Sequence, residues 1–148
     1  MDRREGRRLE FPLLAAAIGL LAWLLLGRLD EARASFEEAT VRLETTTLRK
    51  ELLDRLAHQQ AVGDAPPDSA NPVVWTGNAP ANYRGELARP PEETAVWYFD
   101  TRRRELVYRF RSGREARFRL ARGPETANAP ASLAGIGLLK VEEKDGER

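Results

Sequence analysis

The residues best suited to chemistry in this sequence are arginines between positions 102 and 122. This stretch holds nine arginines and two glutamates. If it forms a β-hairpin, strand alternation places four arginines on one face, opposite Tyr108, Phe110 and Phe118. The four are Arg109, Arg111, Arg117 and Arg119. Guanidinium groups bind phosphates and carboxylates, so this face is a candidate site for nucleic acid, anionic lipid headgroups or an acidic partner. The alternative is the solvated face of a one-sided sheet, because Arg outnumbers Lys 21 to 3 throughout the chain.

Residues for catalysis or metal binding are scarce. The chain has no Cys, which excludes a thiol nucleophile, a disulfide framework and a cysteine-ligated metal site. The single His, His58, stands near a predicted helix end, where a cation complements the helix dipole. The serines lack a nucleophile-elbow pattern, and no phosphate-binding glycine loop or metal-ligand spacing occurs. We therefore predict a protein that is not an enzyme and that needs no cofactor or metal.

The elements around these residues begin with a membrane helix. Residues 11–27 carry no charge in seventeen positions and are rich in Leu and Ala, which favours a transmembrane helix. Arginines precede the run within residues 1–10, and Asp30 and Glu31 follow it. By the positive-inside rule, residues 1–10 form a basic cytoplasmic tail and the chain after residue 28 lies across the membrane.

Two further interpretations of this segment stay open. Ala32-Arg33-Ala34 offers small residues for cleavage of a signal peptide, although acidic residues stand just upstream. The run could also be a buried helix. Within it, Ala15 and Gly19 form a small-xxx-small pair, which predicts a site where another membrane helix packs closely.

Residues 28–62 are predicted to continue the helix as an amphipathic stalk. We expect one helix from about Leu9, with Pro12 at its entrance, to Ala61, stopped by Gly63. Spacings of three and four make an apolar stripe that slips by one residue at three consecutive threonines, where we expect a bend. The stripe is Leu29, Ala32, Phe36, Ala39 and Leu43, then Leu48, Leu52, Leu53 and Leu56. It serves either an intermolecular coiled coil or packing against the chain's own sheet.

The remainder predicts a small antiparallel sheet. Residues 63–94 are rich in Pro, Gly and Asn and predict an ordered loop. Apolar alternation predicts strands at 95–99, 106–110 and 116–120 and a weaker one near 136–141, within a sheet unit at 95–141. Residues 142–148 predict a flexible polar tail. A one-sided sheet must be covered, so the predicted fold class is α+β, with the long N-terminal helix packed on an antiparallel β-meander.

This layout resembles type IV pilins and type II secretion pseudopilins. The local sequence adds to the resemblance at Asn71-Pro72, at Pro80-Ala81-Asn82-Tyr83-Arg84-Gly85-Glu86, at Trp97-Tyr98-Phe99-Asp100 and at Glu105-Leu106-Val107-Tyr108. Members of that family carry a Gly followed by Phe or Met as the prepilin peptidase site, and a Glu five residues into the mature chain. Here Arg7 follows Gly6, and Glu10 falls at the fourth position, so we expect no such processing.

The resemblance implies a single-pass protein of the bacterial inner membrane with its C-terminal part in the periplasm. It implies a pilin-like component of a type IV pilus or type II secretion machine, with membrane lipid and other pilin-like or secretion-machine proteins as partners. Two alternatives stay open from the residues alone. One is a bitopic scaffold of another envelope assembly that uses its stalk as a coiled coil, and the other is an anchored anion- or nucleic-acid-binding module.

Overall fold

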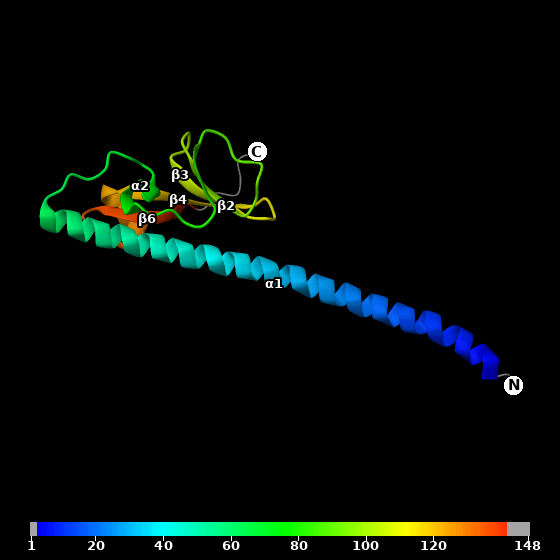
Figure 1. Ribbon diagram of the computed structural model, residues 1–148. Helices are drawn as coiled ribbons and strands as arrows, with labels where there is room; N and C mark the ends of the chain where they lie inside the picture. Colours follow the sequence, from blue (N-terminus) through cyan, green and yellow to red (C-terminus); the bar gives the residue numbers. More distant parts are fainter. Residues whose placement is uncertain (1–2, 142–148) are drawn as a thin grey trace. The chain divides into compact units, whose positions relative to one another are not determined.

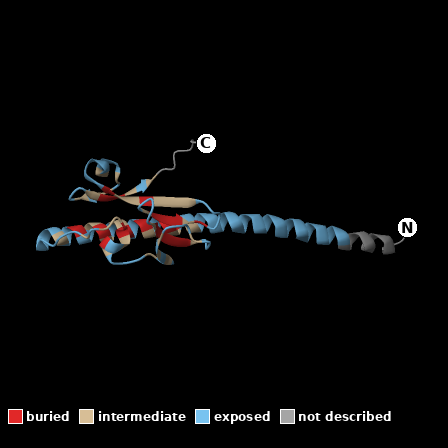
Figure 2. Ribbon diagram, turned by 90° about the horizontal axis from the view of Figure 1, so that it is seen from above, coloured by how far each residue is buried: buried red, intermediate tan, exposed pale blue. Residues whose placement is uncertain are grey.

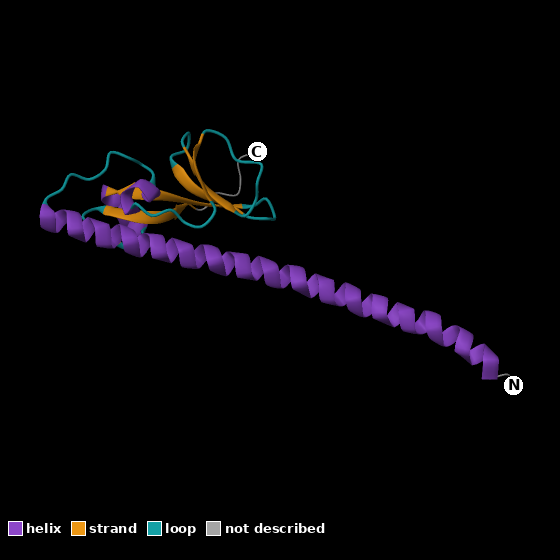
Figure 3. Ribbon diagram, viewed as in Figure 1, coloured by secondary structure: helices purple, strands orange, loops and turns teal. Residues whose placement is uncertain are grey.

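The computed structural model describes residues 3–141, with side chains for residues 12–141. A long helix is followed by a short helix and a sheet (Figure 3). The helices are α1 (Arg3–Val62), α2 (Pro72–Thr76) and the 3-10 helix η1 (Gly123–Asn128). The strands are β1 (Tyr83–Leu87), β2 (Val96–Asp100), β3 (Glu105–Arg109), β4 (Glu115–Arg122), β5 (Ser132–Leu133) and β6 (Ile136–Val141). The predicted α+β class is confirmed, and the predicted flexible tail at 142–148 lies outside the described residues.

The chain divides into two compact units, Met1–Thr40 and Val41–Arg148, and the boundary falls inside α1. In the first unit, every described residue is helical. The second unit holds the rest of α1, the two short helices and the whole sheet. The hydrophobic core cluster lies wholly within the second unit.

α1 starts earlier than the sequence predicts. It begins at Arg3, so Pro12 lies inside the helix and not at its entrance. Arg, Glu and Leu are good helix formers, so the helix extends back through residues 3–11 although Pro12 removes one interior backbone hydrogen bond. The other end agrees with the prediction, because the backbone N–H of Gly63 donates to the carbonyl of Gln59 at 2.8 Å. Gly63 has a φ of 79°, a left-handed conformation that a glycine adopts without strain.

The three threonines do not interrupt α1, although we expected a bend there. The hydroxyls of Thr45 and Thr46 donate to the carbonyls of Val41 and Arg42, at 2.6 and 2.8 Å. Each hydroxyl is thus satisfied by its own helix, and the backbone remains helical through all three positions. Thr45 is buried, so this local bond also supplies the partner that a buried hydroxyl needs.

The face of α1 that packs on the sheet differs from the predicted stripe. Leu48, Leu52 and Leu56 are buried as predicted, but Leu43 is 68% exposed. The buried face continues backward through Thr45 to Val41, at spacings of three and four, with no slip. The apparent slip arose because the pattern was followed through a different, exposed row of apolar residues.

The core of the second unit lies between this helix face and one face of the sheet. Buried residues appear red in Figure 2 on both α1 and the strands. The core cluster joins the apolar face of α1 to α2 and to strands β2, β3, β4 and β6. Its strand and α2 members are Trp75, Trp97, Phe99, Leu106, Tyr108, Phe118 and Leu138, with Phe110 just after β3. The prediction that the stalk packs on the chain's own sheet is confirmed for residues 41–56.

The sheet has six strands in the order β1-β2-β3-β4-β6-β5. β2, β3, β4 and β6 match the four predicted strands to within two residues and pair antiparallel. β1 pairs with β2 in a parallel arrangement, whereas the predicted sheet was an antiparallel meander. Consecutive strands can run parallel only if the chain crosses back between them, and residues 88–95 make that connection.

Residues 63–94 are more structured than the predicted loop. They contain both α2 and β1. α2 begins after Asn71, whose side chain accepts from the backbone of Val73, and ends at Gly77, which has a φ of 71°. β1 contains Gly85, at φ 88°, where the pairing with β2 is irregular. One helical turn and one short, bulged strand are too brief to give a hydrophobic period in the sequence.

The second face of the sheet is also partly covered. Val96, Tyr98 and Val107 are buried on the side opposite α1. Arg109 on the same side donates from Nη1 to the carbonyl of Pro91 at 2.6 Å. The connection between β1 and β2 therefore crosses this face and shields it from solvent. β2 is accordingly buried on both faces over residues 96–99.

Candidate functional site

The apolar segment of α1 is the largest exposed hydrophobic surface among the described residues. Every residue from 12 to 36 is exposed, including Leu13 at 76% and Trp23 at 70%. α1 is long and apolar enough to cross a membrane, by length and composition. Apolar side chains in water at this density are unfavourable, so the segment needs an apolar surrounding such as lipid.

Ala15 and Gly19, the predicted helix-packing pair, lie in this segment and are both exposed. A β-carbon added at Gly19 would meet no atom within 4 Å. The surface above Gly19 is therefore open to a second helix, and the packing role remains a prediction.

The predicted arginine face is only partly formed. Arg109 lies on β3, and Arg117 and Arg119 lie on β4, all on the face opposite α1. Arg111 follows the end of β3 and sits in an exposed turn. Strand alternation thus brings three of the four predicted residues onto one face, and binding of an anion there remains a prediction.

Carboxylates and a carbonyl already engage the three strand arginines. Arg117 Nη2 lies 2.8 Å from Glu115 Oε2, and Arg119 Nη2 lies 3.3 Å from Glu125 Oε1. Arg109 bonds to Pro91, as described above. All three side chains are half-buried rather than fully solvated. Their charge is therefore used largely inside the fold, where it holds η1 and the β1–β2 connection against the sheet.

Three exposed arginines lie instead in the turn between β2 and β3. Arg102, Arg103 and Arg104 occupy this turn and are all exposed. Sequence reasoning counted them in the basic stretch but gave them no role, because strand alternation says nothing about a turn. Three consecutive arginines between two strand patterns were the available signal.

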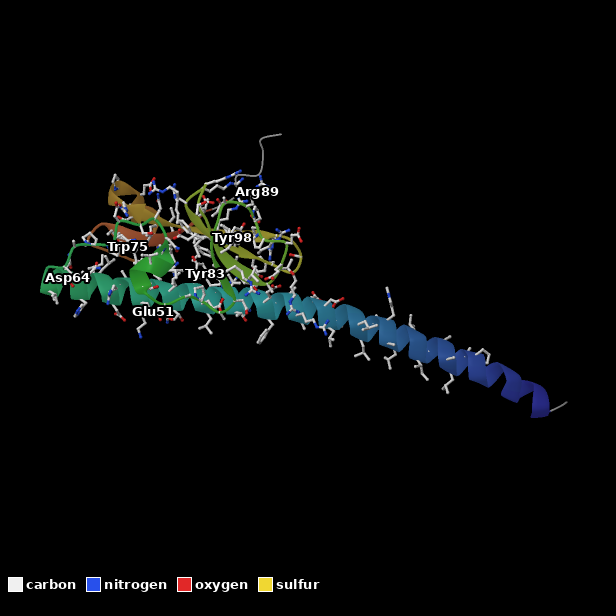
Figure 4. The ribbon with its side chains drawn as sticks, turned by 45° about the horizontal axis from the view of Figure 1, so that its top comes forward. Glu51, Asp64, Trp75, Tyr83, Arg89 and Tyr98 are labelled. Carbon is white, nitrogen blue, oxygen red and sulfur yellow. The ribbon has the colours of Figure 1, made fainter. Side chains whose placement is uncertain are left out.

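A polar network centred on the buried Asn71 links residues that carry the family resemblance, with Tyr83 half-buried and Glu86 exposed. Asn71 is 2% exposed, and its Nδ2 donates to Tyr83 Oη and to Glu86 Oε1, both at 2.9 Å. Its Oδ1 accepts from the backbone N–H of Val73 at 3.0 Å. One amide therefore caps α2 and fastens it to β1, with every polar atom of the side chain satisfied. Tyr83 is labelled in Figure 4.

A second set of contacts fastens α2 to β4. Trp75 Nε1 donates to the carbonyl of Ser69 at 2.8 Å, and Arg122 Nη2 donates to the same carbonyl at 3.1 Å. The Arg122 guanidinium also lies 5.6 Å from the centre of the Trp75 ring, a cation–π contact. Trp75, also labelled in Figure 4, thus joins the core while its indole N–H is paired.

Two tyrosines, Tyr83 and Tyr98, have a raised pKa because of their surroundings in the fold. Burial, together with the neighbouring Glu115 carboxylate, raises the pKa of Tyr98 to about 12. Tyr98 Oη lies 3.2 Å from Glu115 Oε1. Burial also raises the pKa of Tyr83. Both phenols therefore stay protonated at neutral pH; Tyr98 donates to Glu115, whereas Tyr83 accepts from Asn71.

A groove of about 180 Å³ lies between α1 and residues 78–81. Leu43, Leu48 and Pro80 contribute apolar walls, and Glu44 and Glu51 line it with carboxylates. Glu51 Oε1 accepts from Asn78 Nδ2 at 3.0 Å, which ties the loop to the helix.

Among the residues with described side chains, no group of three or more His, Asp or Glu side chains could hold a metal ion. Comparison with protein-family models, with curated proteins and with solved structures finds no match to this chain.

Proposed function

We propose that the chain is a non-enzymatic, single-pass membrane-anchored protein and a pilin-like or pseudopilin-like component of a type IV pilus or type II secretion machine. The observation that carries the proposal is that two parts of α1 differ in burial. Its residues 12–36 are exposed and largely apolar, whereas its residues 41–56 supply one side of the core of a small sheet domain. In this proposal one helix anchors the chain in the membrane and also forms part of the core of the sheet domain.

The burial of the stalk face supports this function over the scaffold alternative. A coiled-coil scaffold needs a free apolar stripe along its stalk. Leu48, Leu52 and Leu56 are instead 5%, 1% and 3% exposed and pack on the sheet. The Asn71 network adds support, because it gives a structural reason for Asn71, Tyr83 and Glu86, which belong to the resemblance.

The proposed location is a bacterial inner membrane, with residues 1–10 in the cytoplasm and the sheet domain in the periplasm. The arginines before residue 11 and the acidic residues after residue 28 support this orientation. In this setting the proposed action is packing, of the anchor against other membrane helices and of the sheet domain against neighbouring subunits. No catalytic step is part of the proposal.

Location can be tested with single cysteines, because the natural chain has none. Asp64→Cys introduces a thiol in an exposed loop of the sheet domain, and Asp2→Cys introduces one before the anchor. We expect a membrane-impermeant maleimide, applied from the periplasmic side, to label the first variant and not the second until the membrane is opened. The reverse pattern would refute the orientation, and recovery in the soluble fraction would refute the anchor.

Membership in a machine needs a second measurement. Crosslinking in intact membranes, followed by purification, should recover pilus or secretion components together with a chain whose mass includes Met1 or Asp2. A chain that begins near Ser35, recovered alone and soluble, would overturn the proposal. Recovery of a different envelope assembly would favour the scaffold alternative.

A further inference from the structure

β6 runs toward the turn that joins β3 to β4, residues 110–114, named here the β3–β4 turn. β4 and β6 are antiparallel neighbours in the sheet (Figure 1), and their described pairing ends with Val141 opposite Arg117. β4 begins two residues earlier, at Glu115, directly after the turn. A strand advances about 3.3 Å per residue, so three extended residues beyond Val141 span the distance to Arg114. The direction of β6 therefore carries the chain toward the β3–β4 turn and away from the turn between β2 and β3.

The β3–β4 turn presents two arginines on an ordered backbone. Arg111 and Arg114 are both exposed. The N–H of Phe110 donates to the carbonyl of Arg114 at 2.8 Å, and the N–H of Gly113 donates to the carbonyl of Phe110 at 2.9 Å. The Arg114 guanidinium also lies 4.7 Å from the centre of the Phe110 ring. This contact uses the face of the guanidinium, whereas carboxylates bind at its edge, so the stacking positions the cation for an acidic partner.

Residues 142–148, named here the acidic tail, complement this turn in charge. The tail has four acidic residues and two basic ones, whereas the β3–β4 turn has two arginines and no acid. Simple continuation of β6 would place Glu143 opposite Glu115 and a lysine opposite Arg114. Like charges directly opposite each other destabilise a strand pair. Electrostatics thus favours a tail that leaves the register of β6 and brings its carboxylates to the arginines of the turn. The four acids are Glu142, Glu143, Asp145 and Glu147.

We propose that the acidic tail docks on the β3–β4 turn, with its carboxylates paired to Arg111 and Arg114, and thereby keeps these arginines from binding external anions. A carboxylate accepts paired hydrogen bonds from a guanidinium. Because the tail is joined to a neighbouring strand, its effective concentration at the turn is on the order of millimolar, and a soluble anion must displace it. The tail is thus an internal competitor for the basic end of the sheet, in contrast to the flexible tail predicted from composition. This contact lies within the sheet domain and does not depend on a membrane.

Disulfide trapping in the full chain tests the contact, because the natural chain has no cysteine. Lys144→Cys leaves all four tail acids in place and is combined with Ser112→Cys, which lies between the two arginines of the turn. The control pair combines Lys144→Cys with Thr101→Cys, which is equally exposed in the turn between β2 and β3. Both are oxidised with copper phenanthroline in detergent, and the disulfide within one chain is followed by mass. We expect about ten-fold faster closure with position 112. Equal rates for the two pairs would overturn the proposal.

A neutral tail separates docking from mere tethering. Replacing the four tail acids by their amides keeps the length of the tail and removes its negative charge. Crosslinking to Ser112→Cys should then slow about five-fold, the effect expected for the loss of two exposed ion pairs. High salt should slow the acidic tail in the same way. A neutral tail that reacts as fast as the acidic one would overturn the role of the carboxylates, and the proposal with it.

Retention on heparin, used as a polyanion probe, tests whether the tail masks the arginines. The neutral-tail variant is compared with a variant in which four exposed acids elsewhere in the sheet domain are replaced by amides, so that both have the same net charge. These four are Asp54, Asp64, Asp68 and Glu92. We expect the neutral-tail variant to elute at the higher salt concentration, because only there are the turn arginines uncovered.

The same column shows which arginines are responsible. Arg111→Gln combined with Arg114→Gln should remove the extra retention of the neutral-tail variant. Equal elution of the two charge-matched variants would overturn the masking, and extra retention that survives the loss of both arginines would overturn their role as the docking site.

Discussion

The indole Nε1 of Trp97 on β2 donates a hydrogen bond to the carboxylate of Glu44 on α1, at 2.5 Å and across 53 residues of sequence. Trp97 is 1% exposed, so its N–H has no access to water. Glu44 lies between the buried residues Val41 and Leu48 along the helix. The bond therefore fixes the rotation of α1 about its own axis against the sheet, which apolar packing alone specifies less sharply.

Removing the Glu44 carboxylate should destabilise the sheet domain. Glu44→Ala leaves a buried indole N–H without a partner, which typically costs about 1–3 kcal/mol in the free energy of unfolding. Glu44→Gln keeps an acceptor and should cost less. Denaturant unfolding in detergent, followed by tryptophan fluorescence, measures the difference. Lys50→Ala, on the exposed side of the helix, is the matched control, and an equal effect of the two alanine variants would contradict the role of Glu44.

The identity of the packed helix face can be tested with two leucines. Leu52 is 1% exposed and Leu43 is 68% exposed. Leu52→Ala opens a cavity in the core and should lower the free energy of unfolding by about 2–5 kcal/mol. Leu43→Ala should change it by no more than about 0.5 kcal/mol. If denaturant titration shows that both variants lower the free energy of unfolding by similar amounts, Leu43 belongs to the packed face, as the sequence predicted.

Even the most conservative substitution of Asn71 should lower the stability of the sheet domain. Asn71→Ala removes a helix cap and two side-chain bonds, and we expect a loss of about 2 kcal/mol. Asn71→Asp keeps the cap but places a carboxylate against Glu86 and the Tyr83 hydroxyl. Its destabilisation should therefore shrink when the pH falls far enough to protonate one carboxylate. Unfolding curves at neutral and acidic pH test this, with Asn128→Ala at the exposed end of η1 as the control.

The raised pKa of Tyr98 predicts weaker folding in alkali. The unfolded chain loses the phenolic proton near pH 10, whereas the folded chain retains it up to about pH 12. The folded state thus holds more protons in this window, and its stability falls as the pH rises through it. Tyr98→Phe should flatten that part of the stability profile, and tyrosinate absorbance should place the folded titration near pH 12. A wild-type profile that is level across this window would disprove the coupling.

Hydrophobic alternation was sufficient to predict most of the sheet. β2, β3 and β4 coincide with runs of five residues whose side chains alternate or are continuously apolar, and a strand imposes that period directly, whereas β6 has a less regular apolar pattern. β1 was missed because Gly85, on its inward-facing side, has no side chain, so that only Tyr83 and Leu87 mark an alternation that the structure does show. Its parallel partnership with β2 depends on a long connection, and no local pattern encodes such a connection.

The candidate sites were harder to predict because their geometry depends on tertiary contacts. Alternation correctly grouped Arg109, Arg117 and Arg119, but it could not show that Glu115 and Glu125 would pair with two of them. The Asn71 network is invisible to periodicity, since its members lie 12 and 15 residues apart on a helix cap and a strand. Polar groups of this kind are fixed only when the chain has already folded around them.

The core cluster reaches from Val41 to Leu138, and this span sets the order of events during biosynthesis. The helix face that includes Leu52 leaves the ribosome first, yet its last strand partner, β6, is made only after all the other core strands. The apolar face of the helix therefore stays incompletely covered until β6 has been synthesised. A chain truncated before β6 would lack the strand that closes this core and should be a substrate for cellular proteases.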